Sequence, residues 1–207
     1  MRPFIFSCCI FLVLSSILVT GRSFLVVSET PSPADVVVQF VGPDDYERHA
    51  KAVDLVTQNL APQLMIPAIF HLSERNTQGE LVQLGGNNIR TIFPCEPWNE
   101  SLASQLMENT HKELLLARCA MDQLQLRSAI LVSSPYHMRR IRLMADRVFD
   151  QDKYRIYCVP AESQTKPQSL WPKGNEWWWV SMEYTKILWF FLYEPFLDEN
   201  GGKAERI

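Results

Sequence analysis

Short apolar runs alternate with amphipathic segments along most of this chain, and that order restricts the fold more than any other feature. Residues 34–41 and 129–133 are nearly free of charge and rich in aliphatic side chains, as buried strands are. Residues 110–124 instead place apolar side chains at helical spacing. Strands that alternate with helices form mostly parallel sheets covered by helices on both faces. We therefore predict an α/β fold: a three-layer, Rossmann-like domain with a mostly parallel sheet.

The other expected elements follow the same order. Helices are expected over residues 45–59, 137–149 and 177–196, and strands over residues 64–70, 89–93 and 154–159. Pro67 interrupts one of these strands, which suggests an edge strand or a bulge. Asp44 or Asp45 is placed to cap the first helix. The polar, glycine-containing residues 73–88 receive no assignment.

An almost uninterrupted apolar segment, Pro3 to Thr20, precedes the domain. Its length lies between that of a signal-peptide core and that of a membrane span. No good cleavage site follows, so we expect a signal anchor at the cell envelope. The alternatives are a cleaved signal peptide with a secreted product, and a membrane tether on a cytosolic domain. The predicted division is residues 1–22 signal peptide or anchor, 23–33 linker, 34–196 domain and 197–207 polar tail.

Composition excludes some classes of function. The 207 residues carry a net charge of −3, without the basic excess of nucleic-acid binders, so no nucleic-acid partner is expected. No zinc-ligand spacing, phosphate-binding loop or Ser-His-Asp order is present, so no metal is expected. Cys119 and Cys158 are expected to be buried as small apolar side chains, and a disulfide involving Cys95 is left open.

The C-terminal third gathers aromatic side chains, six of them within residues 177–179 and 189–191. Trp and Tyr rings favour the interface of a membrane, so these residues could form a belt there. A final helix packed on the sheet is the favoured interpretation, and both arrangements can coexist. Glu183 and Lys186 interrupt the apolar run, which makes it too short to span a bilayer.

The most informative local pattern is the break after the strand at 129–133. Ser133, Ser134 and Pro135 end the strand, and a helix follows with His137, Arg139 and Arg140 near its start. Open α/β sheets bind ligands where strands end before helices. A helix start offers unpaired N–H groups and a positive dipole end, which suit a phosphate or carboxylate. His137 is the candidate for proton transfer because its ordinary pKa lies near neutrality.

This block resembles the signature of the DUF218 (YdcF/SanA/ElyC-like) family, on Tyr136-His137-Met138 and Arg140. Residues 34–38 resemble the family's opening strand, and Glu108-Asn109-Thr110 resembles the segment before its central helix. The resemblance covers roughly residues 34–195. It implies a role in cell-envelope precursor metabolism and an anionic small molecule or lipid-linked phosphate as ligand. S-adenosylmethionine is possible on the same basis, and no enzyme class is implied.

The resemblance assigns roles to particular residues. His137 would be the general acid or base, Arg140 the anion clamp, and Glu108 or Glu113 the partner carboxylate. Thr110 and Glu113 also have the spacing of a helix capping box, which would explain both without a ligand. Glu176 is a weak further candidate. The predicted ligand contacts are Gly42, Asn109, Thr110, Ser133, Ser134, Tyr136, Arg139 and Arg140.

Two departures from the family pattern support an alternative, a degenerate binding or scaffolding module at the membrane. Gly42-Pro43-Asp44 stands where the family has a run of glycines, and residues 69–73 replace a Ser-Gly-Gly-like strand end. A retained site should bury His137 beside Arg140 and a carboxylate, whereas a degenerate one should be filled by Pro43 or Phe70. Asp35 begins the first strand, away from the site, so we expect it to be structural.

Overall fold

A computed structural model describes residues 23–84, 105–161 and 176–197 of the chain. They form one six-stranded sheet in the order β4-β3-β2-β1-β5-β6. Its strands are β1 (Val36–Gln39), β2 (Gln63–Ile66), β3 (His71–Arg75), β4 (Leu81–Gln83), β5 (Ser128–Ser133) and β6 (Arg155–Pro160). β2, β1, β5 and β6 run parallel, and β3 and β4 are antiparallel additions at one edge. The predicted α/β class and mostly parallel sheet are confirmed.

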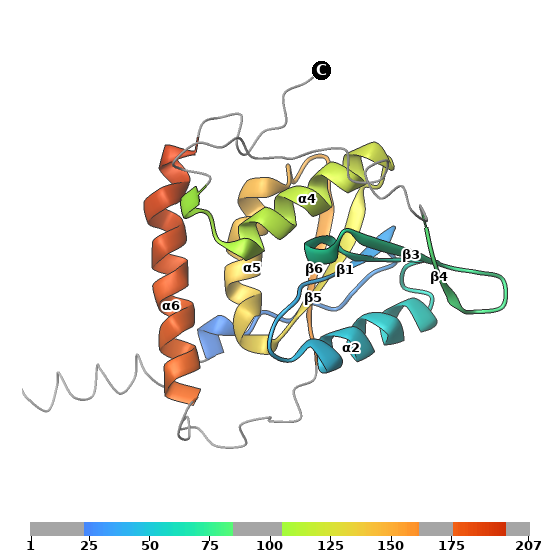
Figure 1. Cartoon of the computed structure of the whole chain (residues 1–207), viewed down its shortest axis with the longest axis horizontal. Helices are drawn as coiled ribbons and strands as arrows, with labels where there is room; N and C mark the ends of the chain where they lie inside the picture. The colour runs from blue at the N-terminus through green and yellow to red at the C-terminus, as the bar shows by residue number, and fades with distance from the viewer. Residues whose placement is uncertain (1–22, 85–104, 162–175, 198–207) are drawn as a thin grey trace, which may run out of the picture.

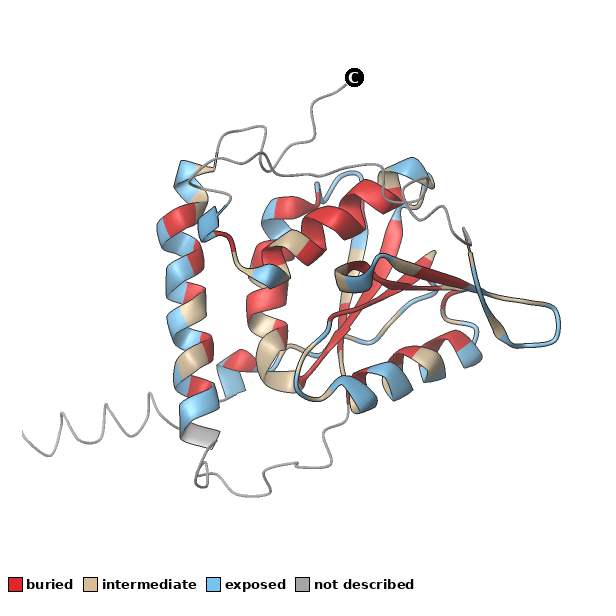
Figure 2. Cartoon of the chain, viewed as in Figure 1, coloured by how far each residue is buried: buried red, intermediate tan, exposed pale blue. Residues whose placement is uncertain are grey.

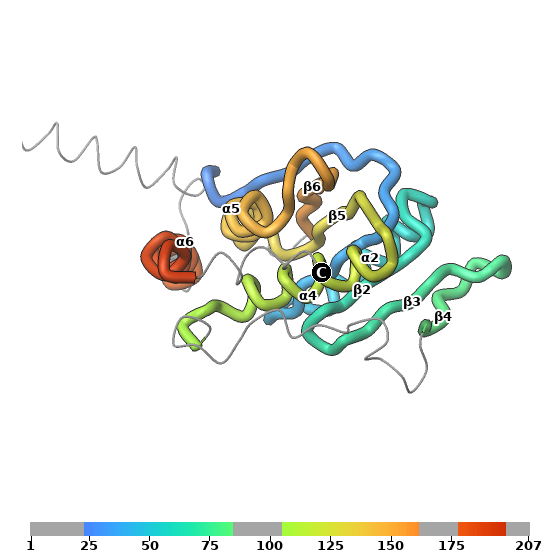
Figure 3. The backbone as a smooth tube through the Cα atoms, turned by 90° about the horizontal axis from the view of Figure 1, so that it is seen from above, coloured from blue at the N-terminus to red at the C-terminus, as the bar shows by residue number. Residues whose placement is uncertain are grey.

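Helices cover both faces of the sheet (Figures 1 and 3). They are α2 (Asp45–Thr57), α4 (Asn109–Gln123), α5 (Met138–Val148) and α6 (Glu176–Tyr193), with short 3-10 turns η1 (Pro67–Ile69), η3 (Pro135–His137) and η4 (Glu194–Phe196). On β1, Val36 and Val38 pack in the cluster that contains α4 and α5, while Val37 packs in the cluster that contains α2. Successive side chains of a strand point to opposite faces, so each strand serves both layers.

The strand expected over residues 64–70 ends at Ile66, so that prediction was wrong in its second half. Pro67 opens η1, Phe70 adopts the left-handed conformation (φ 52°), and the chain reverses into β3. Proline has no N–H for a sheet ladder, and β2 has neighbours on both sides, so the strand stops before it. The unassigned residues 73–88 supply the end of β3 and all of β4. The strand expected over 89–93 lies outside the described residues.

Residues before β1 are packed on the domain. Leu25 is fully buried, and Glu29 bonds to the outer edge of β6 through its N–H to Cys158 O (2.9 Å) and its carboxylate to Cys158 N–H (2.7 Å). Arg142 donates to Ile156 O on the same strand at 3.0 Å. The segment predicted as a linker thus holds one edge of the sheet.

The two described cysteines differ. Cys158 is free and buried, as predicted. Cys119 is also buried, but it is disulfide-bonded to a cysteine outside the described residues. Cys119 therefore does more than fill space in the core.

α6 packs on the domain through one side, as the favoured interpretation of the aromatic region expected, but against α5 and η3 and not on the sheet itself. Val180, Ile187, Phe190 and Tyr193 are buried, while the opposite side is exposed along the helix (Figure 2). His111 of α4 lies 3.0 Å from the Tyr193 hydroxyl and joins the two helices. None of the helices in the described ranges is long and apolar enough to cross a bilayer.

Candidate functional site

The candidate site lies between β1 and β5, where the chain continues to opposite edges of the sheet. From β1 the chain passes through α2 to β2 on one side, and from β5 it passes through α5 to β6 on the other. In open α/β sheets the crevice at the carboxyl ends of two such strands is the usual ligand position. Here those ends carry Phe40 to Gly42 and Ser133 to Ser134, as the sequence predicted for the second strand.

A buried guanidinium ties these two strand ends together. Arg48 of α2 is only 2% exposed and donates from Nε and Nη2 to Ser134 Oγ, at 3.0 and 2.9 Å. Its Nη1 donates to Phe40 O at 3.1 Å, and the Ser134 hydroxyl donates to Asp44 Oδ2 at 2.6 Å. Burial lowers the pKa of Arg48, although Asp44 opposes this. Asp44, one of the two predicted caps, holds the N-cap position of α2, but its carboxylate accepts from Ser134 and makes no cap bond.

Gly42 lies directly against this guanidinium. A Cβ at Gly42 would be 2.3 Å from Arg48 Nη1 and 2.5 Å from Nη2. The position must stay a glycine as long as Arg48 keeps its bonds to Ser134 and Phe40. Gly42, predicted to contact a ligand, thus lies against a cation of the protein itself.

Arg140 of α5 is the centre of a second buried cluster. Its Nε donates to Glu183 Oε2 at 2.8 Å, and its Nη1 donates to Glu108 Oε2 at 2.8 Å and Thr110 Oγ1 at 2.7 Å. Its Nη2 lies 3.4 Å from Glu183 Oε1 and 3.2 Å from His137 Nδ1. Every guanidinium nitrogen therefore faces a protein atom. Arg140, expected to clamp a ligand, binds α4, α5 and α6 to one another.

His137 is oriented by a carboxylate. Its Nδ1 lies 2.9 Å from Glu183 Oε1, and because a carboxylate can only accept, this shorter contact places the proton on Nδ1. The 3.2 Å contact with Arg140 Nη2, which can only donate, is then not a hydrogen bond. Burial lowers the pKa of His137, and the bond to Glu183 raises it by less. The imidazole is therefore neutral at pH 7. Burial would raise the pKa of Glu183, but His137 and Arg140 bring it down to about 2. The ionised carboxylate accepts the Nδ1 proton, and Nε2 is left as the basic nitrogen, with no hydrogen-bond partner among the described residues.

Glu113 of α4 reaches the end of β1. It is 7% exposed, and burial raises its pKa to about 7 against the opposing effects of the Val41 N–H and Arg48. The Val41 N–H donates to its Oε2 at 3.4 Å, a long bond. A carboxyl group with this pKa can both donate and accept a proton near neutrality. The predicted capping box was wrong, because α4 starts at Asn109 and neither Thr110 nor Glu113 caps it.

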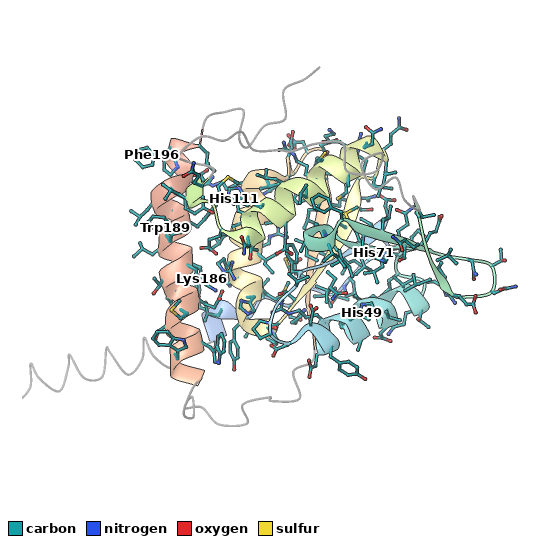
Figure 4. The ribbon with its side chains drawn as sticks, viewed as in Figure 1. His49, His71, His111, Lys186, Trp189 and Phe196 are labelled. Carbon is teal, nitrogen blue, oxygen red and sulfur yellow. The ribbon has the colours of Figure 1, made fainter. Side chains whose placement is uncertain are left out.

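A pocket of about 430 Å³ adjoins the Arg140 cluster. It is lined by Leu106, Met107, Glu108, Asn109, Thr110, Arg140, Thr185, Lys186 and Trp189. Burial raises the pKa of Glu108, with Arg140 opposing, and its Oε1 is buried without a hydrogen-bond partner. Lys186 and Trp189 come from α6 (Figure 4). The pocket therefore combines two cations with a carboxyl group whose pKa is raised by burial.

Two predicted contact residues are turned away from the strand ends. Tyr136 packs with Leu25 and the inner side of α6. Arg139 Nε donates to Phe24 O at 2.7 Å, and its guanidinium lies 4.4 Å from the centre of the Phe24 ring. Ser133 is buried at the end of β5, where its carbonyl accepts the N–H of Ala161. The structure thus brings together His137, Arg140, Glu108 and Thr110 in one cluster and Ser134, Gly42 and Glu113 beside it.

Glu183 is the functional residue that sequence reasoning missed. It was treated as an interruption of an apolar run, and Glu176, which begins α6, was considered instead. A charge on the apolar side of a helix must find a partner on burial, and that signal was available. Glu183 is 2% exposed and pairs with His137 of η3 and Arg140 of α5.

The cluster meets the criterion for a retained site only in part, because His137 is half-buried and does not line the 430 Å³ pocket. His137 lies beside Arg140 and two carboxylates, while Pro43 is exposed and Phe70 is 42% exposed, so neither fills it. His49, His71 and His111 lie on separate elements (Figure 4), and no group of metal-binding side chains converges within the described residues. These features stand on the geometry alone, because no family model, curated protein or solved structure matches the chain.

Proposed function

We propose that this domain binds an anionic ligand at the ends of β1 and β5 and transfers protons there with His137 and Glu113. The observation that carries the proposal is the 2.9 Å contact of His137 Nδ1 with the ionised Glu183 carboxylate. An imidazole that is held, neutral and left with a basic Nε2 has the properties of a general base. Glu113, with its pKa raised to about 7 by burial, supplies a second proton-transfer group.

The cations at this edge of the sheet support an anionic ligand. Arg48 and Arg140 are both buried, and the charge of Arg140 contributes to the lowered pKa of Arg48, after burial itself. Because both are bonded within the protein, they act on a ligand through their field and not as a bidentate clamp. A phosphate-bearing or nucleotide-like molecule fits this charge pattern.

The resemblance to the DUF218 family extends the proposal to the cell envelope. Residues 1–22 would anchor the domain at the membrane or be cleaved from a secreted protein. A disulfide at Cys119 supports an oxidising compartment, where such bonds persist. A lipid-linked phosphate and S-adenosylmethionine are ligand candidates on the basis of the resemblance, and envelope-precursor metabolism is the corresponding role.

A non-catalytic scaffolding module is the second candidate. The observation in its favour is that Arg140 has all its nitrogens directed at protein atoms and that Arg48 occupies the space beneath Gly42. In that case the cluster would serve to hold α6 on the domain.

Ligand-dependent thermal unfolding of the full chain separates the two. The panel contains inorganic phosphate, nucleotides, S-adenosylmethionine and a polyprenyl phosphate, tested on the wild type, His137→Gln and Glu113→Gln. A ligand at about a hundred times its Kd adds roughly 2.7 kcal/mol of stability. We expect one anion to stabilise all three proteins and to be turned over by the wild type alone. Stabilisation by no anion would favour the scaffolding module.

A further inference from the structure

The outer side of α6 lacks the charges that a solvated helix carries. Nine of its residues between 178 and 193 are exposed, and none of them is charged: Trp178, Trp179, Ser181, Tyr184, Thr185, Leu188, Trp189, Phe191 and Leu192. Leu188 is 61% and Leu192 is 55% exposed. Phe196 of η4 extends the same apolar surface and is 77% exposed (Figure 4). We call this set of side chains the α6 outer face, and a contiguous apolar surface of this kind marks an interaction site.

The chain enters the domain beside this face. Leu25 packs with Val180 and Ile187, and the Phe24 ring stacks on Tyr184 with ring centres 6.3 Å apart. The residues just before this point, 3–20, are the apolar segment of the sequence. The apolar segment therefore joins the described part of the chain close to the α6 outer face.

Basic side chains lie at the border of the face. Lys186 is 38% exposed and pairs with Glu183 at 3.4 Å, and Arg139 lies over the Phe24 ring and donates to Phe24 O. Long basic side chains of this kind keep their charged ends in the headgroup layer while their stems cover apolar surface. Glu183, the acidic residue on this stretch of α6, is buried on the inner side. The surface thus combines aromatic rings with a positive border.

From these features we infer that the α6 outer face docks on the surface of a lipid bilayer. Indole rings favour the interfacial layer, and a helix with one apolar and one packed side can lie in that plane. A second copy of the chain on this face supplies no apolar environment for residues 3–20, whereas a bilayer accommodates both the face and the apolar segment that joins the chain next to it. Trp189 and Lys186 also line the 430 Å³ pocket, so docking brings that pocket to the headgroup layer. The docking is independent of the chemistry proposed for His137.

Position-specific labelling of the full chain tests this inference. The protein is reconstituted in vesicles of phosphatidylcholine and phosphatidylglycerol, with an environment-sensitive fluorophore at Leu188→Cys. Tyr46→Cys on α2, 79% exposed, is the matched control, and the chain without an introduced cysteine is the labelling blank. We expect brominated lipids to remove most of the emission from position 188 and little from position 46. Aqueous iodide should do the reverse.

Two results would overturn the inference. Equal access of iodide to positions 188 and 46 would show that the face is in water. Protection of position 188 from both quenchers would show that protein covers it, either a second copy or residues 3–20 of the same chain. Leu192→Cys repeats the measurement at another exposed position, so poor folding of one variant does not leave the question open.

Discussion

The two ends of the β1–β5 strand pair use similar residues for different purposes. At the amino end, Asp35 Oδ2 accepts bonds from the N–H groups of Arg127 and Ser128 and from the Ser128 hydroxyl, each at 2.8 Å. Burial raises the pKa of Asp35, but these bonds outweigh it and hold the pKa below its ordinary value. At the carboxyl end, Ser134 instead bonds a buried guanidinium, and burial raises the pKa of Glu113 to about 7.

The difference shows what a structural carboxylate and a reactive one require. The donors around Asp35 stabilise its ionised form, so it does not bind a proton near neutrality. Glu113 accepts a single long hydrogen bond from the Val41 N–H, and its protonation state changes near pH 7. Perturbed groups of this kind gather at functional sites. Substitutions at the two ends should therefore differ in size and in pH dependence.

Loss of Arg140 should have the largest effect. Arg140→Ala leaves Glu183 and Glu108 buried without their cation, and breaking a buried pair in this way costs about 3–5 kcal/mol. Urea denaturation at pH 7 measures it, with the neighbouring Arg139→Ala as control, because the Arg139 bond to Phe24 is exposed. Equal and small effects of the two substitutions would show that the cluster does not hold α6.

Glu113→Gln should stabilise the protein at alkaline pH. The folded pKa of Glu113 lies above its unfolded value, so the folded state binds the extra proton and stability falls as pH rises from about 4.5 to about 7. A shift of this size corresponds to roughly 3 kcal/mol. The variant should be more stable than the wild type at pH 8, and the two should converge below pH 4.5.

Denaturation across that pH range, with exposed Glu74→Gln of β3 as control, measures the difference. A gap between wild type and Glu113→Gln that stays constant with pH would contradict the raised pKa. An equal gap for the control would attribute the effect to net charge and not to burial.

Gly42→Ala should displace the Arg48 guanidinium from the end of β1. Overpacking of this kind costs about 1–3 kcal/mol. Ser134→Ala removes the side-chain acceptor of Arg48. A double variant therefore tests whether the two substitutions both act by displacing Arg48. We expect the double variant to lose less stability than the sum of the two; strict additivity would mean that Arg48 is not displaced.

Asp35→Asn should have the smallest effect, about 1 kcal/mol for weakened hydrogen bonds at a partly exposed site. Because the folded pKa of Asp35 is depressed, its contribution is present above the unfolded pKa and is lost as pH falls through the folded one. The difference between wild type and variant should accordingly shrink in acid, opposite to the behaviour of Glu113→Gln. Thermal unfolding at pH 7 and pH 3 checks the direction.

Much of the fold followed from the sequence because apolar periodicity reports burial directly. Helices α2, α4, α5 and α6 and strands β1, β5 and β6 lie close to their predicted positions. The reversal from β2 to β3 was missed because Pro67 predicts the end of a strand but not the direction in which the chain continues. Sheet neighbours are set by contacts between distant residues, which no local pattern encodes.

The site was predictable in part. The break after β5 located His137 and Arg140, since strand ends next to helices are recognisable locally. The partners of these residues were not predictable, because Glu183 lies far along the chain, and nothing in the expected helix over residues 45–59 marked Arg48 as buried. Capping spacing misled the interpretation of Glu113, whose carboxylate is drawn to β1 by packing and not by its own helix.

The outer row of β6 has a consequence for how the protein behaves at high concentration. Outward-facing groups recur at every second residue of an edge strand. Here Ile156 O is bonded by Arg142, both polar groups of Cys158 are bonded by Glu29, and Pro160 has no N–H to offer. Little of this row is thus open to a strand from another molecule, and an open edge is the usual starting point for association between sheets. Resistance to aggregation at this edge thus depends on Glu29, a residue of the segment that links the domain to the apolar N-terminus.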